Sequence, residues 1–214
     1  MDLSSYHAVP PEAADVLRPA LPGLAQETVA AIAREVPDYA RAMEGEFGQV
    51  VRRGVEVALN RFVDLLAAPE PDAGMARGTY VDLGRGEFRA GRTLDALLAA
   101  YRVGARLAWR RFVAAGVAGG LPPTAIYALG EAIFAYIDEL SAESAEGYAE
   151  EQSVAAGESE RRRRRLVRLL VQHPPAGEEA VRTAAAAARW ALPRRLAALV
   201  PATGDGGGGA ASEA

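Results

Sequence analysis

The feature that most constrains this chain is a long segment without helix-breaking proline. Pro122 and Pro123 precede it, and the next prolines are Pro174 and Pro175. Because proline is tolerated in the first turn of a helix and ends a helix elsewhere, one continuous helix is predicted over residues 121–172. At about 1.5 Å per residue this helix would be roughly 75 Å long, far longer than a usual helix of a globular domain.

The character of this segment changes along its length. Residues 141–157 are polar and acidic, residues 161–165 are all arginine, and residues 166–171 are again mostly apolar. The first part instead has apolar residues three and four apart, which predicts a helix packed on a core: Ile126, Leu129, Ile133, Phe134, Ile137 and Leu140. We interpret the segment as a signalling helix that begins in one domain, leaves it through a polar neck and enters a second module.

Composition favours an all-α helical bundle. Half of the residues are hydrophobic, but many of these are alanine, and runs of strand-forming residues are nearly absent. The net charge of −4 argues against a nucleic-acid surface over the whole chain. The absence of cysteine excludes disulfides, thiolate metal sites and cysteine nucleophiles. Without a long apolar run or a signal-peptide pattern, the chain is predicted to be cytoplasmic, with no membrane segment.

Shorter helices are predicted before the long one. Residues 1–9 lack periodicity and are expected to be a loose tail, and Thr93 is a candidate N-cap for a helix that ends near Ala118. The predicted organisation is a tail with a short helix (1–21), a helical input and dimerisation domain (22–140), a linker helix (141–173), the beginning of an incomplete second domain (174–203) and a disordered tail (204–214).

The second domain is inferred from one predicted strand, Leu196–Val200. The backbone groups of a strand need a partner strand, and this chain offers none. The region after Pro174 is therefore expected to be the start of a domain whose remainder is missing.

Two strings of residues carry a family resemblance. Gly91–Arg106 reads GRTLDALLAAYRVGAR and is followed by Trp109, and Phe134–Ser141 reads FAYIDELS and runs on to Tyr148. Together they resemble the N-terminal sensory domain of PucR/CdaR-type transcriptional regulators from actinobacteria. That domain is related to the N-terminal domain of RsbT co-antagonist (RsbR-type) stressosome proteins. The resemblance covers roughly residues 22–170.

The resemblance implies an all-α input and dimerisation domain, with a globin-like arrangement without haem as one form of it. In the family a helical linker follows, then a diguanylate-cyclase-like domain and a DNA-binding helix-turn-helix. No helix-turn-helix remains in this sequence. We therefore expect no direct DNA binding by this chain. The alternative is a stand-alone protein-interaction domain of stressosome (RsbR-like) type.

Catalytic and cofactor sites are not expected. The only histidines, His7 and His173, lie outside the predicted core helices, so neither a haem ligand nor a two-histidine metal site is available. Asp138 and its acidic neighbours, spaced along a helix without a nearby histidine or cysteine, are more typical of a solvated face than of an acid–base pair. The chain is predicted not to be an enzyme and to need no cofactor.

Charged residues on two helices have alternative interpretations. The arginines of residues 161–165 could contact nucleic acid or an anionic membrane, but pairing of Glu158 with Arg162 and of Glu160 with Arg164 is favoured. A second stripe, Arg102, Arg106 and Arg110, could recognise a carboxylate or a phosphorylated partner. Salt bridges to another element are favoured there too.

The candidate residues for ligand binding or signal coupling are Tyr101, Arg102, Arg106, Trp109, Tyr136 and Asp138. We expect an unknown small-molecule or protein signal to shift the packing of the 93–118 helix against the base of the long helix. A homodimer is predicted through the long helix, at small residues that permit close approach: Ala142, Ala145, Gly147 and Ala149.

Overall fold

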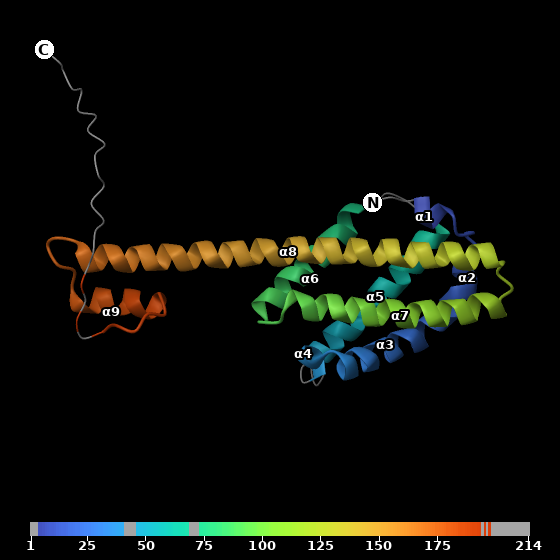
Figure 1. Ribbon diagram of the computed structural model, residues 1–214, viewed down its shortest axis with the longest axis horizontal. Coiled ribbons are helices and arrows are strands. Elements are labelled where there is room, and N and C mark those ends of the chain that lie inside the picture. The colour runs from blue at the N-terminus through green and yellow to red at the C-terminus, as the bar shows by residue number, and fades with distance from the viewer. Residues whose placement is uncertain (1–3, 41–45, 69–72, 194, 196, 198–214) are drawn as a thin grey trace, which may run out of the picture. The chain divides into compact units, whose positions relative to one another are not determined.

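The computed structural model describes residues 4–40, 46–68, 73–193, 195 and 197, and every regular element among them is helical. This confirms the predicted all-α class, while the globin-like arrangement stays a prediction. The elements, shown in Figure 1, are α1 (Ser4–His7), α2 (Ala13–Leu17), a 3-10 turn η1 (Arg18–Ala20), α3 (Leu21–Glu35), α4 (Pro37–Ala40), α5 (Glu46–Ala67), α6 (Ala73–Arg89), α7 (Leu94–Ala118), α8 (Pro123–Val171) and α9 (Glu178–Ala187).

The long helix α8 is continuous between its flanking prolines, as predicted. The start of α7 also follows the sequence, because the Thr93 hydroxyl accepts a hydrogen bond of 3.1 Å from the backbone N–H of Ala96. Proline similarly sets both ends of α3, with Pro22 in its first turn and Pro37 after its last residue. Local sequence thus determines these helix ends.

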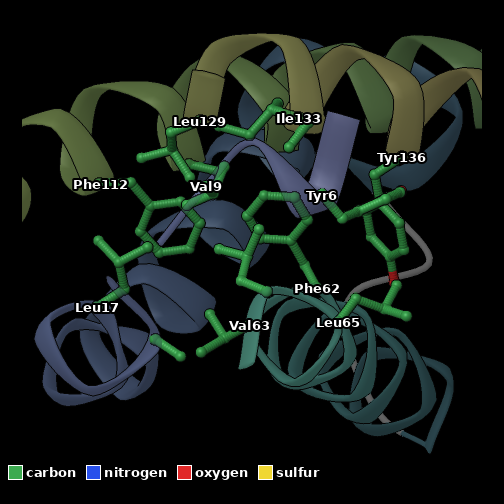
Figure 2. Close-up of a cluster of buried hydrophobic side chains, with 14 of the residues drawn as sticks. Tyr6, Val9, Leu17, Phe62, Val63, Leu65, Phe112, Leu129, Ile133 and Tyr136 are labelled. Atoms are coloured by element: carbon green, nitrogen blue, oxygen red, sulfur yellow. The ribbon is translucent and has the colours of Figure 1, made fainter. Parts of the chain in front are cut away.

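The chain divides into two compact units, residues 1–153 and 154–214, and the division falls inside α8. The core of the first unit is centred on Phe62 of α5 (Figure 2). Its ring stacks on Phe112 of α7 with centroids 5.7 Å apart, and lies 5.4 Å from the ring of Tyr136 of α8. Three helices distant in the sequence therefore meet at one aromatic cluster.

The N-terminal segment also belongs to this core, so the expected loose tail is wrong for the described residues. Tyr6 and Val9 are each only 1% exposed, and the Tyr6 ring lies 6.4 Å from that of Phe62. Two core contacts within so short a segment give no helical periodicity, which is why the sequence pattern did not reveal them.

The predicted apolar stripe of α8 needs one correction. Phe134 is 71% exposed, whereas its neighbour Ile133 is buried. Adjacent residues of an α-helix point about 100° apart, so both side chains cannot face the same core. Phe134 therefore belongs to an outer face of α8.

Helices α6 and α8 lie in backbone contact. A Cβ atom added at Gly84 of α6 would overlap the carbonyl of Ser144, and one added at Gly147 of α8 would overlap the carbonyl of Val81. Gly147, which was expected to help two copies of the long helix approach each other, is therefore covered by α6 of the same chain.

The second unit contains the end of α8 and α9. Leu166 of α8 is buried against Ala184 and Ala185 of α9. The predicted pairs of the arginine run are confirmed: Arg162 contacts Glu158 at 3.0 Å, and Arg164 contacts Glu160 at 2.8 Å. Of the predicted strand 196–200, only residue 197 lies within the described part of the chain.

Candidate functional site: an apolar cavity with buried tyrosines

The first unit contains a cavity of about 450 Å³ among α3, α5, α6, α7 and α8. Its walls are almost entirely apolar. The side chains that α5, α7 and α8 contribute include Val51, Val55, Leu59, Phe62, Leu97, Ala105, Phe112, Ile133, Ile137 and Leu140. The volume lies within the range of about 300–1,000 Å³ that is typical of small-molecule sites.

The cavity exists because α5 packs tightly along only half of its length. Residues 62, 63, 65 and 66 of α5 are buried, whereas none of residues 49–61 is. Val50 and Val57, which line the cavity, remain 62% and 50% exposed. An apolar helix face that does not reach the core leaves both a space and an opening to solvent.

Two tyrosines of the cavity wall form a hydrogen-bonded pair. The hydroxyl oxygens of Tyr80 in α6 and Tyr136 in α8 are 3.0 Å apart, and the Tyr136 hydroxyl donates to the carbonyl oxygen of Ala58 in α5 at 2.9 Å. Since the Tyr136 proton is used there, Tyr80 is the donor of the pair. Burial raises the pKa of both phenols above the usual value, so both stay protonated at neutral pH.

A third tyrosine connects α7 to the same region of α8. The hydroxyl oxygens of Tyr101 and Ser144 are 2.8 Å apart, and Ser144 in turn donates to the carbonyl oxygen of Tyr80 at 3.2 Å. Tyr101 is therefore the donor to Ser144. Ser144 is 0% exposed, and burial raises the pKa of Tyr101. Helices α6, α7 and α8 are thus joined by one network beside the cavity.

A buried carboxylate closes another part of the wall. Glu87 of α6 is 2% exposed and accepts hydrogen bonds from Arg92, whose Nε and Nη2 lie 2.5 and 3.0 Å from its two carboxylate oxygens. The Tyr39 hydroxyl donates to it at 2.9 Å, and the Arg92 guanidinium lies 5.7 Å from the centre of the Tyr39 ring. The Glu87 charge is therefore fully engaged by the protein itself.

Thr28 of α3 is a polar residue of the cavity wall whose hydroxyl takes part in none of these hydrogen bonds. It is 3% exposed, and its hydroxyl oxygen has no hydrogen-bond partner among the described residues. A buried hydroxyl without a partner is unfavourable, and such groups in native proteins require an explanation.

A family model for the PucR-like N-terminal domain matches residues 6–171. The chain belongs to this family. PucR-like N-terminal domains are regulatory domains rather than enzymes. No curated protein and no solved structure matches the chain. The family assignment thus confirms the resemblance drawn from the sequence and extends it to the N-terminal segment that carries Tyr6.

The structure brings two of the six candidate residues predicted from the sequence to the cavity of this PucR-like domain. Tyr101 and Tyr136 line the cavity. Arg106 is exposed and pairs with Glu35 of α3 at 2.5 Å, so it makes the salt bridge to another helix that was favoured for the arginine stripe. The remaining three, Arg102, Trp109 and Asp138, are exposed on α7 and α8.

Several residues of the site were not found from the sequence. Thr28, Tyr80 and Glu87 come from helices that carry no motif, and their partners are distant in the chain. One signal was available in α5, where an apolar face continues through Val50, Val51 and Val55 although the fold buries only its second half. That asymmetry becomes visible only with the packing known.

The described residues include neither a candidate metal site nor a candidate membrane span. No cluster of three or more His, Cys, Asp or Glu side chains is placed to hold a metal ion there. Over the same residues, no helix combines the length and the apolar character needed to cross a membrane.

Proposed function

We propose that this PucR-like domain is the cytoplasmic input and dimerisation module of a transcriptional regulator, and that another domain contacts the DNA. A signal that occupies the cavity changes the packing of α6 and α7 on α8. Such a signal acts only if it binds two arrangements of these helices with different affinity. The net charge of −4 supports a module that does not bind DNA itself.

The observation that carries this proposal is the double role of α8. The helix supplies Ile133, Tyr136, Ile137 and Leu140 to the cavity wall. About three turns after Leu140, it receives contacts from α6: Arg85 pairs with Glu150 at 2.6 Å, and Arg89 pairs with Glu151 at 2.7 Å. A change of helix packing at the cavity would therefore act on the same helix that continues to Val171.

An exposed aromatic surface on α7 and α8 supports dimerisation. Tyr127 and Phe134 of α8 are 74% and 71% exposed, and Trp109 of α7 is 38% exposed. The Trp109 ring packs closely against Gly130, between the two α8 aromatics. We call Trp109, Tyr127 and Phe134 the aromatic surface. Exposed aromatic residues grouped in this way are typical of protein interfaces.

Charges beside the aromatic surface favour a second copy as the partner. Arg102 lies seven residues before Trp109 on α7, and Glu131 and Asp138 lie four residues after Tyr127 and Phe134 on α8. These spacings place each charge on the same helix face as its aromatic neighbour. All three side chains are exposed. Because the surface carries both signs, a two-fold axis can oppose the Arg102 of one copy to an acidic residue of the other.

Sedimentation velocity of the full chain at micromolar concentration tests the proposed dimer. The parent protein is expected to be dimeric, and Phe134→Glu is expected to weaken the dimer at least about tenfold, because it places a charge in an apolar interface. Val154→Glu, at another exposed apolar residue of α8, is the matched control and should leave the dimer unchanged. A monomeric parent protein would refute the dimer, and a stable assembly larger than a dimer would favour the stand-alone RsbR-like alternative.

A further inference from the structure

We propose that the cavity binds an uncharged, mainly apolar small molecule that presents one hydrogen-bonding group to Thr28. This inference rests on the proposed input function and assigns the chemical class of its signal. Three observations support it: the apolar walls, the absence of an unpaired charge in the buried wall among the described residues, and the unpartnered Thr28 hydroxyl.

The apolar walls provide the driving force for binding. The first half of α5 lines the cavity with half-buried or exposed valine, alanine and leucine side chains, from Val50 to Leu59. An apolar ligand would remove this surface from water, which is favourable in proportion to the area covered. A folded domain that leaves such a face open beside a preformed cavity has the usual character of a ligand site.

The polar groups of the wall exclude an ionic ligand from its interior. The Glu87 carboxylate is held by Arg92 and Tyr39, and the hydroxyls of Tyr80, Tyr101 and Tyr136 are engaged within the protein. A charged group entering this space would lose its hydration without gaining a counter-charge. The arginine that lines the cavity, Arg53, is exposed, so a carboxylate could reach it only at the opening.

Thr28 makes the cavity selective for ligands that carry a hydrogen-bonding group. Thr28 lines the cavity, and its buried hydroxyl has no hydrogen-bond partner among the described residues. A threonine hydroxyl can donate one hydrogen bond and accept others. A ligand hydroxyl or carbonyl that reaches it would satisfy a group that is otherwise unpaired, which favours such a ligand over an alkane of the same size.

Four probes with the same eight-carbon chain test the chemical class: 1-octanol, octanoate, octylammonium and 1-chlorooctane. Binding to the full chain is measured at neutral pH by displacement of Nile red. Octanol is expected to bind at least about tenfold more tightly than either ion. Octanoate binding as tightly as octanol would overturn the uncharged class and point to Arg53, and no binding by any probe would overturn the site. Dimer formation by sedimentation is independent of both outcomes, so failure of the ligand class is distinguishable from failure of the input module.

Substitutions locate the binding to this cavity. Ala105→Phe places a ring in the cavity and should abolish octanol binding, whereas Ala114→Phe, the same change at an exposed position of α7, should not. If Ala105→Phe does not fold, Val55→Phe at the half-buried part of the wall serves the same purpose. Equal octanol affinity in a folded cavity variant and in Ala114→Phe would overturn the assignment.

Thr28→Val tests the hydrogen bond without changing the shape of the side chain. It is expected to weaken octanol binding about fivefold, the loss of one ordinary hydrogen bond, and to leave 1-chlorooctane binding unchanged. Equal weakening of both probes would show that Thr28 acts through packing and would overturn its assigned role.

Discussion

At the scale of single residues, the Glu87 carboxylate is the group that most needs a counter-charge, because it is a buried charge in an apolar wall. Its stability depends on Arg92, whose side chain is itself only 16% exposed. Removing one partner of a buried ion pair leaves an uncompensated charge, which costs more than the pair contributes.

We therefore expect Arg92→Met to lower the free energy of unfolding by about 2–4 kcal/mol, measured by urea denaturation. Arg89→Met is the matched control. Its pair with Glu151 is exposed, with the Arg89 side chain 65% accessible, so its loss should cost less than about 1 kcal/mol. Adding Glu87→Gln to Arg92→Met should recover part of the loss. Equal effects of the two arginine variants would contradict a buried, paired Glu87.

Single residues also show what the sequence could and could not predict. Thr93 was identified as an N-cap because its partner lies three residues away. The Tyr80–Tyr136 pair joins residues 56 positions apart in the chain, and neither tyrosine has a local pattern that indicates the other. Local hydrogen bonds were therefore predictable, whereas the network that builds the site was not.

At the scale of elements, the contact of α6 with α8 is the one least tolerant of added volume. The backbones touch at Gly84 and Gly147, and the ring of Phe88 meets that of Tyr148 edge-on with centroids 5.3 Å apart. Ion pairs from α6 flank the same contact. Because these residues follow the cavity along α8, the α6–α8 contact is where a packing change would be transmitted.

Gly84→Ala is expected to destabilise the protein by about 1–3 kcal/mol, since its Cβ would push the two backbones apart. Gly86→Ala, two residues further along α6, has open space around its Cβ and is the control. Alanine is the better helix former there, so this variant should gain up to about 1 kcal/mol. Thermal unfolding of both variants measures these changes in stability. A Gly84→Ala variant as stable as the parent protein would show that the helices are not in backbone contact.

Helix prediction succeeded where prolines and caps mark the ends, as in α7 and α8. It did not reveal the cavity, because the apolar face of α5 has the same periodicity whether or not it is packed. It also placed Phe134 in the core, since apolar character alone does not separate an interior face from an exposed one.

At the scale of the whole molecule, the account depends on coupling between the cavity and α8. The cavity wall, the tyrosine network and the α6 contacts follow one another along α8 from Ile133 to Glu151. A molecule that fills the cavity should hold α5, α7 and this part of α8 in one arrangement. Local opening that exposes the backbone amides of these helices to exchange should then be less frequent.

Hydrogen–deuterium exchange of the full chain, with and without saturating 1-octanol, tests this coupling most directly. The account predicts slower exchange in residues 133–151 of α8 as well as in the cavity-lining parts of α5 and α7, and no such change in Ala105→Phe. Saturated binding that slows exchange in α5 alone, with residues 133–151 of α8 unchanged, would contradict it.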